Sequence, residues 1–418
     1  MRIAQVMHGW PAKQMGGTGL YVEALSRALS ELGHEVAIVY PSQSKVKPMD
    51  VDGGLSIHGV AVPPLRRWRD TWDGPNEAWT SWCTDWAPDV VHFHHLSGFP
   101  LSIIAATSCR SVLTLHDYAI PCARGQLVTE ALAPCSGPTP IDCTRCLGPA
   151  LSGGPLMTAA GRMLARLPGV YRWAKTRVSS AHPQPHEAVT DRIAAAHRAI
   201  RAADQVLSPS RDLAQRMEAM GFGDIGHTAL PLVQDIPHSP RPEPGPVRFL
   251  FASTIIPTKG PDRLVRAFKQ LRADAQLTIA GHAPDFPTHP GFSAALQADA
   301  ATDPRIAWTG PVAPSEMGKL LARHDVLVLP SLWSENSPLI VREATAAGLS
   351  VIASAAGGAR ELVPEGEFVE TDEELLAALQ RACSSGRRRQ PRARWPSPGE
   401  HANALLSEAY KGNGRTVN

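Results

Sequence analysis

The sequence predicts an α/β protein with two domains of ordinary size, each built on a parallel sheet. The chain has 418 residues, of which 43% are hydrophobic, enough to form two cores. Residues 324–364 have the pattern of a strand, a loop, a helix and a second strand, the unit from which parallel sheets are assembled. Residues 2–39 repeat that order, with a glycine-bearing loop at residues 8–19. Ligand groups are therefore expected at the carboxyl ends of the strands.

The unit at residues 324–364 has clear boundaries. Its first strand is the apolar run 326–329, which is short and branched enough to be buried on both faces. Cap-type residues then precede Pro338, so the helix is expected to begin there and to end at Gly348. A second helix is expected to begin at Ala359, after a pair of glycines.

Two carboxylates, Glu335 in the loop and Glu343 in the helix, are the main chemical feature of this unit. The amides of a strand–loop–helix edge attract an anion, and acids beside that edge can accept hydrogen bonds from hydroxyls. A sugar nucleotide offers both phosphates and hydroxyls. The alternative is that Glu343 is an exposed helix residue and Glu335 an acid at a helix start.

The stretch PSLWSENSPLIVREATAAGLSVIAS, followed by GGARELV, resembles the signature of retaining family 4 glycosyltransferases. That resemblance covers nearly the whole chain. It implies the GT-B fold, in which two Rossmann-like domains face an interdomain cleft and a C-terminal helix crosses back to the first domain. The expected parts are an acceptor-binding domain at 1–236 with a cysteine-rich insertion at 120–148, a proline-rich linker at 237–248, a nucleotide-sugar-binding domain at 249–385 and a crossing helix at 395–410.

The resemblance also implies roles for individual residues. Glu343 would hold the ribose hydroxyls, Glu335 a sugar hydroxyl and Lys259 the diphosphate, with Glu335 and Lys259 counted as catalytic. Lys259 precedes Gly260 and Pro261, which set a helix start, so its charge and the helix amides can together neutralise a leaving diphosphate. Thr254 stands where the family commonly has arginine. The implied donor-binding positions are Gly16, Gly17, Ser253, Thr254, Lys259, Gly281, Val312, Asn336, Ser337, Pro338, Leu339 and Glu343.

Histidines follow two further predicted strands. His116 lies in the sequence LTLHD, where the resembled family keeps a histidine against the donor sugar, so we count His116 as catalytic. His92, His94 and His95 could form a metal cluster, but alternation along a strand places them on different faces and acids are lacking nearby.

Four cysteines, Cys122, Cys135, Cys143 and Cys146, fall in one loop-rich segment that ends in C-x-x-C. In a cytosolic chain this density favours a structural zinc site, with free or redox-active thiols as the alternative. The glycosyl-transfer chemistry itself is expected to require no cofactor.

Charge and hydropathy limit the partners. A net charge of +2 gives no argument for nucleic acid, and no apolar run approaches the roughly 20 residues of a membrane span. The cytoplasm is the expected compartment. The stretch 155–180 is basic and amphipathic and contains no acid, so it either contacts the inner face of a membrane or packs on its own domain.

The function that the resemblance implies is retaining, metal-independent transfer of a hexose from a nucleotide-diphosphate sugar to a hydroxyl acceptor. A glycan, a lipid-linked saccharide and a natural-product aglycone all fit as acceptors. Two alternatives stay open: a non-catalytic sugar-nucleotide-binding subunit of a glycosylation complex, and a sugar-nucleotide 2-epimerase or phosphorylase. The sequence does not indicate the base of the nucleotide.

Overall fold

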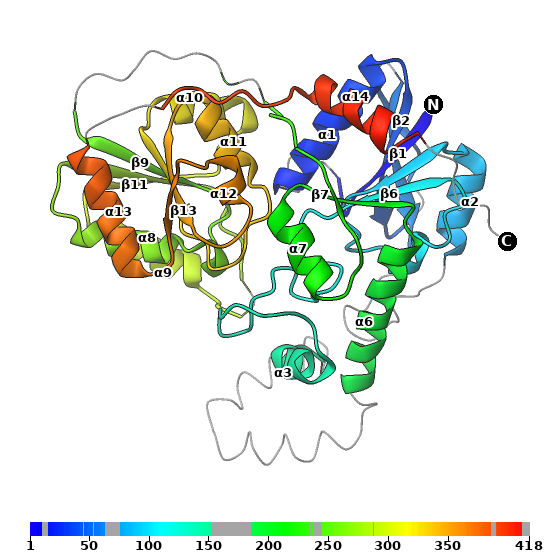
Figure 1. Cartoon of the computed structure of the whole chain (residues 1–418), viewed down its shortest axis with the longest axis horizontal. Coiled ribbons are helices and arrows are strands. Elements are labelled where there is room, and N and C mark those ends of the chain that lie inside the picture. The colour runs from blue at the N-terminus through cyan, green and yellow to red at the C-terminus, as the bar shows by residue number, and fades with distance from the viewer. Residues whose placement is uncertain are drawn as a thin grey trace.

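The computed structural model contains two sheets that lie side by side, with helices packed around each (Figure 1). It describes residues 1–10, 16–44, 46–52, 54–62, 76–151, 185–234, 236, 245–286, 288–385 and 390–411. The stretch 155–180, expected to contact a membrane, lies outside these residues, as do residues 237–244 of the expected linker. None of the helices in the described ranges is both long and apolar enough to span a bilayer.

The first sheet has the strand order β3-β4-β2-β1-β5-β6-β7-β8, and every pairing except β3 with β4 is parallel. Alternate residues of its central strand enter two separate cores, Ile3 one and Ala4 the other, so this sheet is covered on both faces. Its strands are β1 (Arg2–Val6), β2 (Glu35–Ser42), β3 (Met49–Asp52), β4 (Leu55–Ala61), β5 (Val90–Phe93), β6 (Arg110–Thr114), β7 (Gln205–Ser208) and β8 (Gly226–His227). Its helices are α1 (Gly16–Glu31), α2 (Glu77–Trp86), the 3-10 turn η2 (Leu101–Ile103), α3 (Pro140–Leu151), α6 (Pro185–Ala202) and α7 (Arg211–Ala219).

The second sheet is parallel throughout, in the order β11-β10-β9-β12-β13-β14. Phe249 and Leu250 of its central strand point into opposite cores, so this sheet too is covered on both faces. Its strands are β9 (Val247–Ala252), β10 (Ala275–Ala280), β11 (Ile306–Gly310), β12 (Val326–Leu329), β13 (Ser350–Ser354) and β14 (Glu367–Val369). Its helices are the 3-10 turn η3 (Pro257–Lys259), α8 (Pro261–Gln270), α9 (Phe292–Ala300), α10 (Pro314–Ala322), α11 (Leu339–Ala346), α12 (Ala359–Leu362) and α13 (Asp372–Ser384).

The boundaries predicted for residues 324–364 are confirmed. The strand spans 326–329, the helix begins directly after Pro338, and the next helix begins at Ala359. Gly348 has a φ of +81°, as expected of a left-handed helix stop. The prediction of a loop through residue 19 is wrong, because α1 already begins at Gly16. Gly16 has a φ of +69°, a conformation that glycine adopts without a steric penalty.

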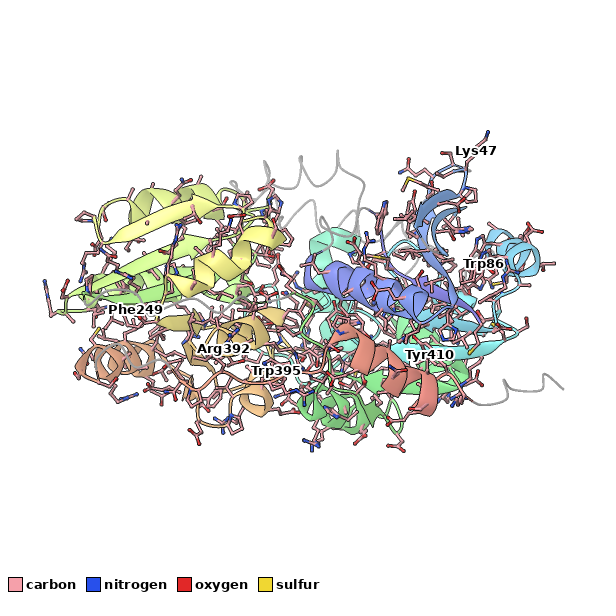
Figure 2. All side chains as sticks on the ribbon, turned by 90° about the horizontal axis from the view of Figure 1, so that it is seen from above. Lys47, Trp86, Phe249, Arg392, Trp395 and Tyr410 are labelled. Carbon is pink, nitrogen blue, oxygen red and sulfur yellow. The ribbon has the colours of Figure 1, made fainter. Side chains whose placement is uncertain are left out.

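A last helix, α14 (Pro398–Glu408), packs against α1 and not against the second sheet (Figure 1). The segment before it leaves the second sheet with a hydrogen bond from the Ala393 amide to the Thr345 carbonyl, 3.0 Å. Further along this segment, the Pro396 carbonyl accepts a hydrogen bond from the Leu232 amide at 2.9 Å. Figure 2 shows Arg392 and Trp395 on this segment and Tyr410 beyond α14, on the first domain. Serine at 397 and glutamate at 400 form a capping box that starts the helix.

Candidate active site

The strand orders place a candidate site at the carboxyl ends of the central strands. In the first sheet the order reverses between β1 and β5, and in the second between β9 and β12. Ligands of open α/β sheets bind at such switch points, because loops diverge there to opposite faces. Lys259 follows β9 and Glu335 follows β12, so the switch point of the second sheet brings together two of the predicted residues, while His94 follows β5 at the switch point of the first sheet.

Lys259 and Glu335 form a buried ion pair. The lysine Nζ lies 2.6 Å from Glu335 Oε1 and 2.9 Å from Oε2, and the two side chains are 16% and 5% exposed. Trp333 donates its indole N–H to the same carboxylate at 2.9 Å, and Ser331 donates its hydroxyl at 2.6 Å. The ammonium also lies 4.8 Å from the centre of the Trp333 ring, within range of a cation–π contact. The carboxylate is therefore held by three donors in one place.

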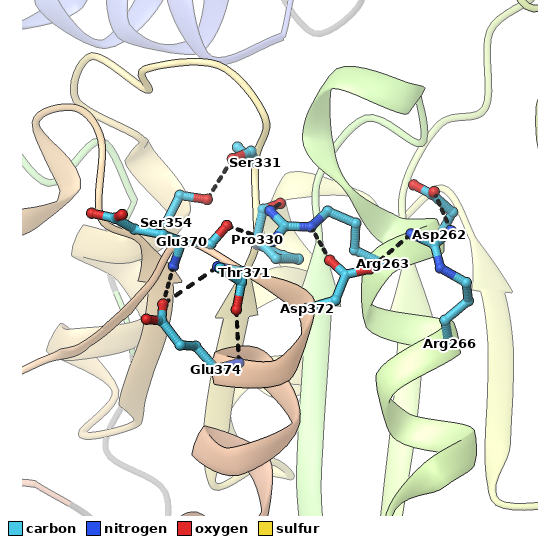
Figure 3. A network of polar contacts seen from close by, with 10 residues as sticks. All are labelled: Asp262, Arg263, Arg266, Pro330, Ser331, Ser354, Glu370, Thr371, Asp372 and Glu374. Carbon is cyan, nitrogen blue, oxygen red and sulfur yellow. Dashed lines mark hydrogen bonds and ion pairs between the residues drawn. The ribbon is translucent and has the colours of Figure 1, made fainter. Parts of the chain in front are cut away.

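Arg263 of α8 holds the start of the loop that carries Glu335, and Figure 3 shows its contacts. Its guanidinium donates to Asp372 at 2.6 Å, to the Pro330 carbonyl at 3.3 Å and to the Glu370 carbonyl at 2.9 Å. Ser354 of β13 donates its hydroxyl to the next carbonyl, that of Ser331. The backbone just before Glu335 is thus fixed from two neighbouring elements.

Glu343 lies in α11 and is 4% exposed. Burial raises the pKa of its carboxyl from the ordinary 4.5 to about 7, and a hydrogen bond from the Gln234 amide, 2.8 Å, opposes that rise. A carboxyl with such a pKa is partly ionised at neutral pH and gains from additional hydrogen-bond donors. Ribose hydroxyls are donors of the required kind. Sequence reasoning missed Gln234, which stands in a LPLVQD segment that departs from the family pattern.

The ends of β9, β10 and β11 gather the other predicted donor positions of the second domain. The Ser253 amide donates to the Ala280 carbonyl at 3.2 Å, and the Gly281 amide donates to the Gly310 carbonyl at 2.9 Å. A Cβ at Gly281 would lie 1.8 Å from the Ser253 carbonyl oxygen, so only glycine allows this close approach. Ser253 and Thr254 are half-buried. Val312 packs at the edge of the core that contains Leu250.

The loop from Asn336 to Leu339 faces the first domain. A Cβ at Gly17 would lie 3.4 Å from Leu339 Cδ1, so the first turn of α1 meets the start of α11. Gly16 has a φ of +69° and open space around it. The starts of α1 and α11 therefore lie close together, and the first N–H groups of a helix have no acceptor within it.

The Asn336 side chain serves the interface between domains, a role that the prediction did not include. Its amide nitrogen donates to the Leu115 carbonyl at 2.9 Å, and its oxygen accepts from the Ser210 hydroxyl at 2.6 Å. Beside it, the Glu361 carboxylate accepts hydrogen bonds from the backbone amides of Arg211 and Asp212, at 2.9 and 2.8 Å. A carboxylate at the start of α7 also interacts favourably with the helix dipole.

Arg342, next to Glu343, was not singled out from the sequence and is 1% exposed. It donates to the Ser337 hydroxyl at 2.7 Å, and its guanidinium carbon lies 4.5 Å from the centre of the Trp395 ring. Its Nε and Nη1 are buried and have no partner among the described residues. Burial lowers the pKa of Arg342 to about 10, so it remains a cation at neutral pH. It links the predicted donor loop to the segment that crosses between domains.

His116 is half-buried, two residues beyond β6, and its Nε2 lies 3.2 Å from His94 Nδ1. Burial lowers the pKa of its imidazole to about 3, so the ring is neutral at pH 7. It can exchange hydrogen bonds with a sugar but carries no positive charge there. Asp117, beside it, accepts from Ala119 N at 2.8 Å and pairs with His95 at 3.3 Å.

The four cysteines of the insertion are free thiols. Burial raises the pKa of Cys143 and Cys146 in α3, and the thiols of Cys122 and Cys135 raise both further, so the four interact. Arg192 of α6 holds the segment with hydrogen bonds to three consecutive carbonyls, from residue 119 to 121. Within the described ranges, however, no three His, Cys, Asp or Glu side chains stand close enough together to hold a metal ion.

Comparison with known proteins agrees with this arrangement. The family model described as glycosyl transferases group 1 matches residues 246–385, and the one described as glycosyltransferase family 4 matches residues 15–132. The D-inositol 3-phosphate glycosyltransferase of Xylanimonas cellulosilytica is 28% identical over 363 residues, which are 83% of this chain and 77% of that protein.

Solved structures show the same fold. Sucrose-phosphate synthase from Thermosynechococcus elongatus aligns with a TM-score of 0.60 at 15% identity, over 98% of this chain and 94% of that one. HepE of Anabaena, in complex with UDP and glucose, aligns with a TM-score of 0.56 at 15% identity, over 98% and 95%. The two family matches fall on the two sheets, whose arrangement is that of GT-B glycosyltransferases. The chain belongs to the family 4 glycosyltransferases, which transfer a sugar from a nucleotide sugar.

Proposed function

We propose that this protein transfers a hexose from a nucleotide-diphosphate sugar to a hydroxyl acceptor with retention of the anomeric configuration. The observation that carries the proposal is the Lys259–Glu335 pair at one switch point, with the partly ionised Glu343 in the helix that follows. Such a donor has a diphosphate, which a cation can bind, and hydroxyls, which carboxylates can bind. Lys259 is the cation, and Glu335 and Glu343 are the carboxylates. HepE, a protein with the same fold, is described as a complex with UDP and glucose.

Each residue has a proposed role. Glu343 accepts hydrogen bonds from the ribose hydroxyls, and Glu335 accepts one from a hydroxyl of the sugar. Lys259 neutralises the diphosphate, helped by hydroxyls at positions 253 and 254 and by the amides of residues 336–339. This division leaves Thr254 in place of an arginine, so less positive charge faces the diphosphate than is common in the family.

In the proposed reaction the bond between the anomeric carbon and the diphosphate oxygen breaks, and the acceptor hydroxyl bonds to the same face of that carbon. The departing diphosphate takes the acceptor proton, so the protein supplies no general base. Charge builds up on the leaving oxygen and on the ring, and preorganised groups such as Lys259 stabilise it without reorganisation. Neutral His116 contributes a hydrogen bond at the sugar. We propose that the chemistry needs no metal ion.

The first test is a calorimetric screen of UDP-, GDP-, dTDP- and ADP-sugars against the wild type and Glu343→Ala. A nucleotide that binds the wild type at least tenfold more tightly than the variant identifies the donor. Proton NMR of the product then reads the anomeric configuration, and inversion would refute retention. Conversion of the donor without an acceptor would favour an epimerase. Binding with no turnover of any acceptor would favour a non-catalytic subunit.

A further inference from the structure

A continuous line of hydrogen bonds connects His116 to the C-terminal end of the described chain. From His116, bonds run to His94 (3.2 Å), to Gln5 (2.6 Å), to Tyr410 (3.2 Å), to His92 (2.7 Å) and to Thr114 (2.7 Å). We call these six residues the histidine chain. They come from β1, β5, β6, the segments just after β5 and β6, and the residue pair after α14, so only the folded domain with its returning C-terminal segment assembles them.

The Gln5 amide sets the direction of every bond in the histidine chain. Its NH2 group can only donate, and it faces the Tyr410 hydroxyl, while its oxygen can only accept and faces His94 Nε2. His94 must therefore carry its proton on Nε2. Because a neutral imidazole has one donor and one acceptor nitrogen, His94 Nδ1 accepts, and His116 has to donate from Nε2.

The other half of the chain is consistent with this direction. Tyr410 accepts from Gln5 and so has its own proton free to donate to His92 Nδ1. His92 then carries its proton on Nε2 and donates it to the Thr114 hydroxyl. In this arrangement each of the five bonds has one donor and one acceptor, so all five can form at once.

We propose that Gln5 and Tyr410 are positioning residues that fix His116 as the Nε2–H tautomer, leaving Nδ1 as a lone-pair acceptor for a hydroxyl of the donor sugar. The last clause rests on the proposed function, and the tautomer itself does not. A fixed acceptor discriminates: a sugar that presents O–H toward Nδ1 is bound, and one that presents only an acceptor is not.

Burial keeps the histidine chain neutral, which a fixed direction requires. His92 is fully buried and His94 nearly so, and burial lowers the pKa of each well below its ordinary value, with the neighbouring imidazoles lowering it further. The nearby Asp117 carboxylate pairs with His95, outside the chain. Burial is the main cause of the lowered pKa of His116; the Asp117 carboxylate raises that pKa, and His95, His8 and His401 lower it. A protonated member would donate from both nitrogens and would break the order of donors.

Selective ¹⁵N labelling of histidine tests the tautomer without any substrate. The two ring nitrogens of a neutral imidazole have well-separated shifts, and the His116 signals are assigned by their loss in His116→Asn. We expect the Nε2–H form in the ligand-free wild type. The Nδ1–H form, or an even mixture of both, would overturn the proposal. Because this readout needs no turnover, an inactive protein with the expected tautomer would refute only the proposed function.

Variants then link the tautomer to the reaction. Gln5→Met keeps the length of the side chain but removes both its donor and its acceptor, so His116 is expected to populate both tautomers. The value of kcat/KM should fall about fivefold to tenfold, the factor of one net hydrogen bond. Thr114→Val is the matched control, because it removes a buried hydroxyl at the far end of the same chain. It should leave the His116 tautomer unchanged and kcat/KM within about twofold. An equal loss of kcat/KM in both variants would show a merely structural effect and would overturn the proposal.

Discussion

Lys259 Nζ and Glu335 Oε1 lie 2.6 Å apart in a setting where both side chains are largely shielded from water. The pair joins the end of β9 to the end of β12, the two strands between which the second sheet reverses its order. A diphosphate would compete with Glu335 for the ammonium, and a sugar hydroxyl would compete with Lys259 for the carboxylate. A donor that carries both groups could replace the ion pair by two new contacts, as the proposed roles of Lys259 and Glu335 require.

Lys259→Met should lower both stability and activity. The variant leaves a buried carboxylate without its cation, which costs about 3 kcal/mol of unfolding free energy. Loss of the charge at the diphosphate should lower kcat/KM by about 10²- to 10³-fold. The double variant with Glu335→Gln should recover most of the stability and none of the activity, measured by denaturant unfolding and initial rates.

Lys269→Met is the control for that experiment. Its partner Asp299 lies at 2.7 Å, but both side chains are more exposed, at 33% and 47%. Such a pair contributes less than about 1 kcal/mol, and the site does not use it. Full activity in the Lys259→Met/Glu335→Gln variant would show that the pair is structural only.

Glu343 should make stability depend on pH between about 4.5 and 7. The folded state holds the Glu343 proton up to about pH 7, whereas the unfolded chain releases it near 4.5. The unfolding free energy should therefore fall as pH rises through this window, by about 3 kcal/mol, and then level off. Nucleotide binding should strengthen over the same range, because the ionised carboxylate accepts more hydroxyls. Glu343→Gln should remove both trends, and an unchanged pH slope in that variant would contradict the assignment.

Gly358→Ala should separate the domains. Gly358 has a φ of −72°, so alanine causes no backbone strain, but its Cβ would lie 1.9 Å from the Asn336 carbonyl oxygen and 2.5 Å from Ser210 Cβ. We expect a larger radius of gyration by small-angle scattering and a fall in kcat. Gly399→Ala is the control, since the nearest atom would be 4.0 Å away and alanine favours the helix by up to about 1 kcal/mol. Unchanged scattering in Gly358→Ala would show that the interface repacks around the methyl group.

The prediction of a structural zinc site is still to be tested. Zinc binding by Cys122, Cys135, Cys143 and Cys146 would require the four thiols to converge further on one point. We expect elemental analysis of protein purified without chelator to give roughly one zinc ion per chain. That zinc should be lost in Cys146→Ser and kept in Cys383→Ser. A zinc-free protein in which all four thiols react with a thiol reagent under native conditions would contradict the prediction.

The local elements near the site could be predicted from the sequence because short-range signals specify them. The apolar run before Pro330, the cap-type residues before Pro338 and the glycine at 348 set a strand, a helix start and a helix stop by backbone chemistry alone. The motifs of that unit also indicated Glu335 and Glu343, and the segment before Gly260 indicated Lys259. The roles of these three residues stay predictions. The first turn of α1 was placed wrongly because glycines are compatible with both a loop and a helix start.

Only the tertiary structure decided what those residues contact. Gln234 is 109 positions from Glu343, Ser210 is 126 from Asn336, and Tyr410 is 405 from Gln5. Local propensity carries no signal for such pairs, because two sheets and a returning C-terminal segment must first assemble them. The same holds for the pKa values: burial, which dominates the shifts of Glu343 and His116, is a property of the packed chain. The sequence by itself determined which chemical groups stand at the ends of the strands, and packing determined their partners, their charge and the direction of their hydrogen bonds.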